Sequence, residues 1–238
     1  MSVTLNCDMG EGFSNYSFGA DEALMGVVDL ANVACGFHGS DFMQMDAVVG
    51  MAAKAGVRVG AHPSLPDLQG FGRRAMAMTR EEVRNSLIYQ IGALKGFLEA
   101  AGLPLNHIKP HGALYGMALR EEHVAEGIAD ATLIFGVPVM GMPGTRHQEV
   151  FERRGCAFLG EFFADLDYDA DGNLIITRHH DAVDPELAAR RTRRAVIDGI
   201  LETPSGDRPI AVDTVCIHSD TPNVVDIAQA VRGVLAKT

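Results

Sequence analysis

Six side chains with the chemistry for metal binding, proton transfer or charge stabilisation stand at the ends of short apolar runs. Carboxylates and imidazoles are the usual ligands and proton carriers of enzymes, and an ammonium can stabilise a developing negative charge. Each run reads as a strand, so each of these groups is predicted to lie at or near the carboxyl end of a strand. The six are Asp8, His38, His62, Lys109, Glu161 and His218.

One divalent metal ion is the simplest use of such a set, because imidazole nitrogen and carboxylate oxygen suit zinc, manganese, iron or cobalt. We expect Asp8, His38 and His62 as ligands, since they end three consecutive predicted strands. The competing interpretation is that each histidine forms hydrogen bonds in a polar interior and binds no metal. The identity of the metal stays open.

The stretch HIKPHGALYG, His107 to Gly116, places two polar side chains on one face of a strand. Alternation directs His107 and Lys109 to that face and Ile108 to the other. Pro110 cannot donate to a neighbouring strand, so Lys109 is expected near the strand end. A buried ammonium needs an anionic partner, and this partner is either a protein carboxylate or a substrate.

The loop GAHPSLPDLQGFGRR, residues 60–74, begins at the end of the third predicted strand. Its glycines and prolines favour one fixed shape. Arg73 or Arg74 could bind a substrate carboxylate with two parallel hydrogen bonds. Two solvated surface arginines are the alternative.

Strands and helices alternate along the whole chain. Thr79 with Glu82 forms a capping-box pattern, Asp184 precedes Pro185, and Asp41 can cap a further helix. Such alternation predicts a parallel sheet closed into a barrel, with residues 1–238 as one domain, and the active site at the carboxyl ends of the strands. The predicted strands are Val3–Asp8, Ala31–His38, Val57–His62, Leu105–Lys109, Val137–Met140, Ala157–Glu161 and Val212–His218.

Composition narrows the function further. A net charge of −11 disfavours nucleic acid and anionic membranes as partners, and no apolar run is long enough to span a membrane. The first residues do not resemble a signal peptide, so we expect a cytoplasmic enzyme. The chain has neither a GxxxxGK[ST] loop nor a GxGxxG turn, so any nucleotide is bound by other means or by another chain.

Together these motifs resemble the LamB/YcsF or lactam utilisation family, whose members form the A component of 5-oxoprolinase. The resemblance implies an α/β fold with an incomplete (β/α)7 barrel, similar to the glycoside hydrolase/deacetylase superfamily. The matching stretches are LNCDMGEGF from Leu5, ANVACGFH from Ala31, GAHPSLPDLQGFGRR from Gly60, QIGAL from Gln90, KPHGALYG from Lys109, GTRH from Gly144, FAD from Phe163 and VCIHSDTP from Val215.

The resemblance also implies an activity: ATP-dependent hydrolysis of the lactam of 5-oxo-L-proline to L-glutamate, together with partner subunits B and C. ATP is then a cofactor shared with those partners, and assembly with further copies of the chain stays open. Residues carried over from the matching motifs are Asp8, Glu11, Lys109 and His111 as catalytic groups, and Asn6, Arg73, Arg146 and His218 as substrate-binding groups.

Two other functions fit the same residues. One is a metal-dependent amide hydrolase or N-deacetylase that works without ATP. The other is a non-catalytic component that presents a small carboxylate ligand to a partner enzyme.

Overall fold

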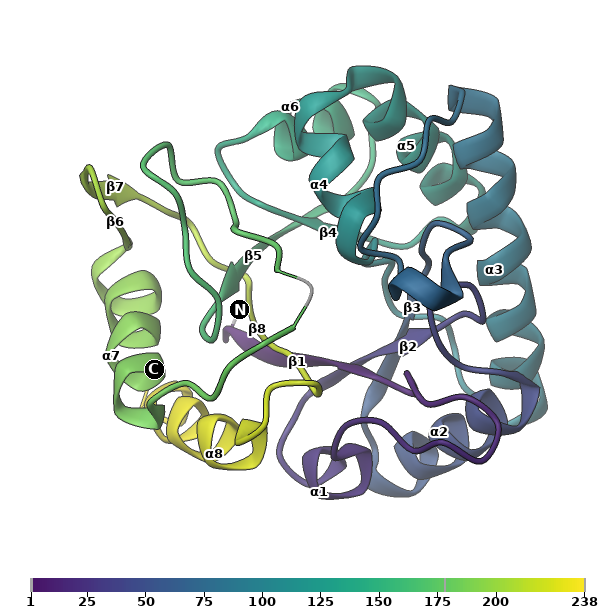
Figure 1. The fold of residues 1–238 in the computed structure, drawn as a ribbon, viewed down its shortest axis with the longest axis horizontal. Helices are drawn as coiled ribbons and strands as arrows, with labels where there is room; N and C mark the ends of the chain where they lie inside the picture. Colours follow the sequence, from purple (N-terminus) through teal and green to yellow (C-terminus); the bar gives the residue numbers. More distant parts are fainter. Residues whose placement is uncertain (1, 178, 238) are drawn as a thin grey trace.

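A parallel sheet of six strands forms the centre of the molecule (Figure 1), in the order β3-β2-β1-β8-β5-β4. The computed structural model describes residues 2–177 and 179–237. The sheet curls, so that its two edge strands approach each other. Its strands are β1 (Thr4–Met9), β2 (Leu30–Ala34), β3 (Arg58–His62), β4 (Val139–Gly141), β5 (Phe158–Phe163) and β8 (Thr214–Ile217).

A single residue joins the two edges of the sheet. Ile108 forms parallel bridges to Ala61 of β3 and to Val139 of β4. A full strand over Leu105–Lys109 was expected; the segment forms only these bridges, although Asn106 and Lys109 also donate backbone hydrogen bonds to Val59 and Ala61. Pro110, which has no N–H group, ends the pairing. The predicted fold class is therefore confirmed as an incomplete α/β barrel of seven positions, one of which is a lone bridging residue.

The second strand is shorter than expected. It ends at Ala34, four residues before His38, because Gly36 takes a positive φ of 91° that an extended strand cannot continue. His38 therefore lies on the loop between β2 and α2, yet it is buried.

Helices surround the sheet on the outside (Figure 1). The expected caps at Asp41, Thr79 and Asp184 are confirmed, because each accepts a backbone hydrogen bond in the first turn, and Thr79 with Glu82 forms a complete capping box. Thr145 caps α6 in the same way. The helices are α1 (Asp21–Met25), α2 (Phe42–Ala55), α3 (Arg80–Ala100), α4 (Gly112–Arg120), α5 (Glu122–Phe135), α6 (Arg146–Arg153), α7 (Pro185–Arg193) and α8 (Val224–Leu235), with short helical turns η1 (Leu68–Gly70) and η2 (Arg194–Asp198).

Two features follow β5: a hairpin that strand and helix patterns did not indicate, and a long connection with a turn at Asp171-Gly172, which the sequence does indicate. An antiparallel hairpin of β6 (Ile200–Thr203) and β7 (Gly206–Pro209) extends from the end of η2. The long connection between β5 and α7 lies in front of β1 and β8 in Figure 1. Its residues Tyr168 and Leu174 form an isolated antiparallel bridge.

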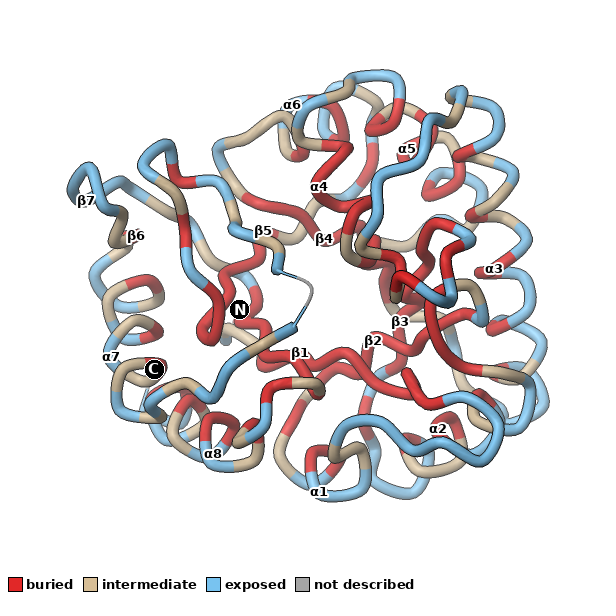
Figure 2. Tube along the Cα trace, in the orientation of Figure 1, coloured by how far each residue is buried: buried red, intermediate tan, exposed pale blue. Residues whose placement is uncertain are grey.

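Alternation along the strands separates an apolar face from a polar one. On β1, Leu5, Cys7 and Met9 pack in the apolar core, whereas Asn6 and Asp8 face the interior of the ring. Buried positions accordingly concentrate along the central strands, and the outer helices carry the exposed ones (Figure 2). Across residues 2–177 and 179–237, none of the helices is both long enough and apolar enough to cross a membrane.

Candidate active site at the carboxyl ends of the strands

The deepest polar layer inside the ring is a set of neutral side chains. Asn6 donates to Thr214 Oγ1 at 2.8 Å, and Asn32 donates to both Asn6 and Asp8 at 2.8 Å. His107 Nε2 lies 2.6 Å from Asn32 Oδ1. This layer supports Asp8 from below, and Asn6, expected to bind substrate, lies beneath the cleft instead of lining it.

Lys109 occupies the centre of the next layer. Its ammonium donates to Asp8 Oδ1 and to Cys216 Sγ, each at 2.8 Å, and lies 3.2 Å from Glu161 Oε1. Burial alone would lower the pKa of Lys109, but Asp8 and the other acidic neighbours raise it well above its ordinary value. Burial would raise the pKa of Asp8, but His62 and Lys109 hold it well below its ordinary value. Both groups are charged at neutral pH.

Three histidines and a carboxylate gather beside this layer. His38 Nε2 lies 3.0 Å from Glu11 Oε1, and His111 Nδ1 lies 3.5 Å from the same oxygen. His62 Nε2 lies 2.9 Å from His111 Nδ1 and 3.2 Å from Asp8 Oδ2. Burial and the Asp8 carboxylate raise the pKa of Glu11 to about 7, and burial lowers the pKa of His38 to about 3.

His218 follows β8 and is oriented by a carboxylate. Its Nδ1 lies 3.0 Å from Asp165 Oδ1, while its Nε2 faces Asp8 Oδ2 at 3.8 Å. Burial would lower the pKa of His218, but the Asp165 carboxylate raises it overall. A histidine held this way can give a proton to a bound molecule or take one from it.

A cleft of about 370 Å³, counting its open mouth, lies above these groups. Its floor contains Asp8, Lys109 and His218, and Arg73 stands at its side. The β5–α7 connection contributes Leu166, Leu174, Ile176 and His180 to the lining, so one wall of the cleft is apolar. The remaining lining residues are His62, Pro110, His111, Gly112, Tyr115, Phe163.

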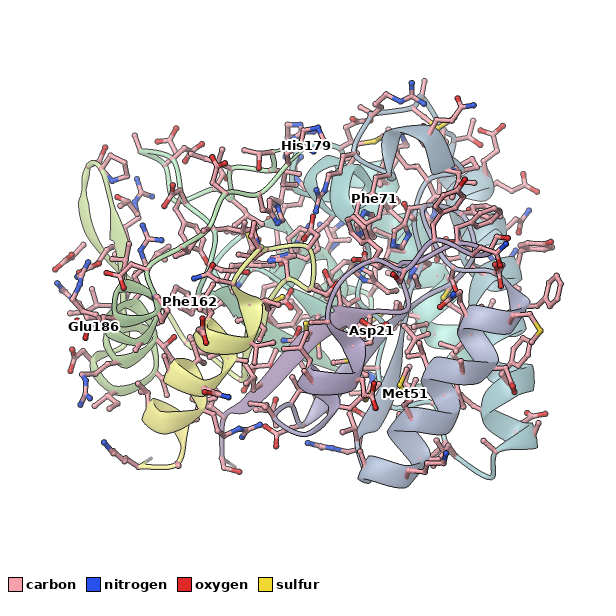
Figure 3. All side chains as sticks on the ribbon, turned by 60° about the horizontal axis from the view of Figure 1, so that its bottom comes forward. Asp21, Met51, Phe71, Phe162, His179 and Glu186 are labelled. Atoms are coloured by element: carbon pink, nitrogen blue, oxygen red, sulfur yellow. The ribbon has the colours of Figure 1, made fainter. Side chains whose placement is uncertain are left out.

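Arg73 and His180 meet at the mouth of the cleft through Asp220. Arg73 Nη2 donates to Asp220 Oδ2 at 2.8 Å, and His180 Nδ1 lies 2.9 Å from the other oxygen. Figure 3 shows Phe71, which precedes Arg73 by two residues, and His179 in the upper half of the molecule. Arg74, the other candidate for a substrate carboxylate, pairs with Asp67 instead.

Arg146 is the predicted site residue that the fold places elsewhere. It is the first residue of α6, and its guanidinium donates to the backbone carbonyl of Arg120 at the end of α4. The direction of α6 turns this side chain to the outside of the ring, and it does not line the cleft.

The structure regroups the expected metal ligands. Glu11, His38, His62 and His111 form one group that could hold an ion, and Asp8 belongs to another, with Cys216 and His218. The expected set combined members of both groups, because strand order alone could not show that Glu11, three residues after Asp8, bends back towards the histidines. The buried donor set is therefore compatible with a divalent metal ion.

Several residues around the cleft escaped the sequence reasoning. Asp165 and Asp220 stand in the motifs FAD and VCIHSDTP, but nothing local marks them as partners of a histidine and an arginine. Leu174 and Ile176 lie in a connection with no strand or helix pattern. They reach the cleft because the β5–α7 connection folds back over it, and the sequence alone does not show this.

Comparison with known proteins gives matches along nearly the whole chain. The sequence model described as "LamB/YcsF family" matches residues 3–238. The A subunit of a 5-oxoprolinase from Thermus thermophilus is 44% identical over 99% of this chain and 96% of that protein. The lactam utilization protein lamB of Emericella nidulans is 39% identical over 97% of this chain and 93% of its own length.

Solved structures agree with these matches. A lactam utilization protein from Thermus thermophilus superposes with a TM-score of 0.92 at 43% identity, covering 100% of this chain and 97% of that one. A family 4 carbohydrate esterase from Streptomyces lividans gives a TM-score of 0.45 at 11% identity, covering 99% of this chain and 88% of that one. A likeness as low as the second supports no conclusion about chemistry.

Proposed function

Because the chain belongs to the LamB/YcsF family, we propose that it is the A subunit of a 5-oxoprolinase and hydrolyses the lactam of 5-oxo-L-proline to L-glutamate. The observation that carries this proposal is the 44% identity to the A subunit of another 5-oxoprolinase over nearly the full length of both chains. The reaction is coupled to ATP and needs partner subunits B and C. The cleft with its cationic and carboxylate groups is where this chain would act on the lactam.

Coupling to ATP has a chemical reason. A five-membered lactam is a stable amide, and phosphorylation of its oxygen makes the ring carbon electrophilic. The sequence has no phosphate-binding loop of the GxxxxGK[ST] kind, so we assign the phosphorylation step to one of the partner subunits. This chain would then receive the activated lactam.

The residues of the cleft then carry out the hydrolysis of the activated lactam. Water attacks the ring carbon and passes a proton to Asp8, while Lys109 stabilises the negative charge that develops on oxygen. The carbon–nitrogen bond breaks as the new hydroxyl group loses its proton to solvent and becomes the carbonyl, the nitrogen takes a proton from His218, and an acyl phosphate of glutamate remains. A second water molecule hydrolyses the acyl phosphate to glutamate and phosphate. Arg73 holds the substrate carboxylate, and the ring of His111 lines the same side of the cleft.

A divalent metal ion would supply a Lewis acid beside this cleft. Glu11, His38, His62 and His111 are the residues that would hold it. The chain's own groups, Asp8, Lys109 and His218, keep the roles just given.

The deciding measurement is glutamate release from 5-oxo-L-proline by this chain alone and mixed with its partner subunits, with and without ATP. We expect release only when the partners and ATP are both present. Release by the chain alone, without ATP and stimulated by a metal, would instead support an ATP-independent amide hydrolase. No release in a folded, associated mixture would refute the proposed substrate.

Asp8→Asn in the same mixture separates a catalytic role from a ligand-presenting one. Loss of the base should reduce turnover by roughly 100-fold or more while the complex still assembles. Unchanged turnover would show that this chain only presents a ligand. His123→Ala, on an exposed position of α5, is the matched control.

A further inference from the structure

We propose that Glu11, His38, His62 and His111 together bind one divalent transition-metal ion of the class of zinc or cobalt(II). All four side chains are buried, and one ligand atom from each lies within 4.8 Å of the others. The inference concerns a binding site formed by this chain alone and does not depend on the lactam reaction. Three observations carry it.

The first observation is that two ring nitrogens, His62 Nε2 and His111 Nδ1, face each other at a distance too short for two bare lone pairs. His62 Nδ1 lies 2.7 Å from the carbonyl oxygen of Lys109, and His111 Nε2 lies 2.8 Å from that of Phe71. A carbonyl oxygen only accepts, so both of these nitrogens carry the ring hydrogen. When both rings are neutral, the two opposite nitrogens, 2.9 Å apart, both present lone pairs. Two acceptors at this distance repel each other unless a cation lies between or beside them.

The same carbonyl contacts are what a metal site needs around its ligands. A histidine that binds a metal usually donates its other ring nitrogen to a carbonyl or carboxylate, which fixes the tautomer and the ring orientation. His62 and His111 are both held in this way, by two different segments of the backbone. Their free nitrogens therefore point to one place.

The second observation is the spacing of the ligand atoms. Metal–ligand bonds of about 2.0 to 2.1 Å place neighbouring ligand atoms roughly 3 to 3.5 Å apart. The distances here are 2.9 Å between His62 and His111, 3.0 Å between His38 and Glu11, and 3.5 Å between His111 and Glu11. The separation of His62 from Glu11 is 4.0 Å. A small adjustment of the side chains would bring all four to one ion.

The third observation is that hydrogen bonds do not account for the burial of His38. Its Nδ1 is buried and has no hydrogen-bond partner among residues 2–177 and 179–237. Its ring stacks on that of His111 with 3.7 Å between centroids, which sets Nε2 beside the other ligand atoms. Burying an imidazole with so few polar contacts is costly, and a bond to a metal ion would offset that cost.

The neighbouring group of Asp8, Cys216 and His218 is a poorer candidate. The ammonium of Lys109 lies 2.8 Å from both Asp8 Oδ1 and Cys216 Sγ. A positive charge is thus already held where a metal ion would have to bind. The two possible sites use different ligands, so replacing one ligand at a time shows which of them binds the metal.

The test is metal binding by the full-length chain, measured without any assay of activity. The chain is stripped with a chelator, dialysed against cobalt(II) or zinc at neutral pH, and analysed for metal content by mass spectrometry. Visible absorption of the cobalt form reports the ligand set. We expect one ion per chain and a cobalt spectrum with nitrogen and oxygen ligands.

Three variants locate the ion. Glu11→Gln and His111→Gln should each weaken binding by about 100-fold or more, because each removes a ligand. His218→Gln is the matched control from the neighbouring group and should bind the metal as the unaltered chain does. Circular dichroism verifies the folding of each variant, and Glu11→Gln keeps the test decisive if His111→Gln does not fold.

Other outcomes would overturn the proposal. A folded chain that binds less than about a tenth of an ion at saturating metal has no such site. Loss of metal with His218→Gln, but not with Glu11→Gln, would place the ion in the other group. Nitrogen NMR that shows His62 protonated on both ring nitrogens in the presence of the metal would mean that a proton, and not a metal ion, removes the repulsion between His62 Nε2 and His111 Nδ1.

Discussion

At the scale of single residues, the buried ammonium of Lys109 decides the electrostatics of the ring. It is the cation that lies between the carboxylates of Asp8 and Glu161, and all three side chains are excluded from water. Alternation along a short segment was enough to predict that Lys109 faces the interior. It could not show that Asp8 and Glu161 both contact the same ammonium.

Replacing this ammonium should be costly. Lys109→Met leaves two buried carboxylates without their cation, and we expect the free energy of unfolding to fall by about 3 to 5 kcal/mol. Urea denaturation measures the change. Lys95→Met is the control, because Lys95 forms only an exposed pair with Glu99 on α3 and should change stability by less than about 0.5 kcal/mol. Equal effects of the two replacements would contradict this account.

A second residue-scale prediction concerns pH. Burial raises the pKa of Asp21 to about 6, although its carboxylate accepts a hydrogen bond from Gly10. The unfolded chain has the ordinary value near 4. Between about pH 4 and 6 the folded state therefore binds more protons, so the Asp21 contribution to stability falls as pH rises through this window and stays low above it.

Asp21→Asn removes that dependence and keeps an oxygen for Gly10. We expect the variant to be more stable than the unaltered chain by about 1 kcal/mol at pH 8, with the difference vanishing near pH 4. The difference is small because Asp21 is partly exposed, so water screens its charge. Asp46→Asn, on the exposed face of α2, should show no such trend in urea titrations. A difference that grows towards low pH would contradict the assignment.

At the scale of elements, the close approach of a strand and a neighbouring imidazole fixes the inner layer. A Cβ atom on Gly60 of β3 would lie 2.1 Å from His107 Nε2, so only glycine leaves room for the ring. The ring in turn reaches Asn32, which supports Asp8. Strand β3 thus sets the position of the Asp8 carboxylate, which lies on β1.

Gly60→Ala should displace His107 and break its contact with Asn32. We expect a loss of about 2 to 3 kcal/mol in the free energy of unfolding. Adding His107→Ala should recover part of this loss, so the two changes are not additive. Gly50→Ala on α2 is the control: nothing lies within 4 Å of the added carbon, and alanine favours the helix. Additive effects would refute the steric argument.

Elements with a strong local pattern could be predicted from the sequence, and the others could not. The capping box at Thr79 and the cap at Asp184 placed the starts of α3 and α7 correctly, because these contacts are local. Hairpin β6–β7 was missed, because the contacts that hold it come from other elements: Glu202 on β6 accepts hydrogen bonds from Arg190 of α7 and Arg194 of η2. Site residues at the ends of strands, such as Asp8 and His62, were predicted. Site residues on the β5–α7 connection, such as Leu174 and Ile176, were missed.

At the scale of the whole molecule, Asp220 connects three segments across the mouth of the cleft. It binds Arg73 from the loop after β3 and His180 from the connection before α7, while itself following β8. That residues 1–238 form one domain, and that copies of the chain associate, both stay predictions.

Asp220→Asn should loosen this tie without unfolding the protein. We expect amide hydrogen exchange in residues 166–177 to become about 10-fold faster, because the contact between His180 and the Asp220 carboxylate, which helps anchor the connection, weakens. Exchange in α3 should not change. Asp207→Asn, which weakens a pair with Arg194 at the exposed hairpin, is the control. Unchanged exchange in residues 166–177 would show that the connection is held by other contacts.

The pairing of β1 with β8 has a consequence for synthesis on the ribosome. Thr4 pairs with Thr214, so the first strand finds one of its two neighbours only after more than two hundred further residues have been made. Until then the nascent chain can pair β1 with β2 alone. Asp8 therefore lacks its neighbours Cys216 and His218, which belong to β8 and the residues after it. We therefore expect ribosome-bound chains that stop short of β8 to depend on chaperones, because their polar interior is still open on one side.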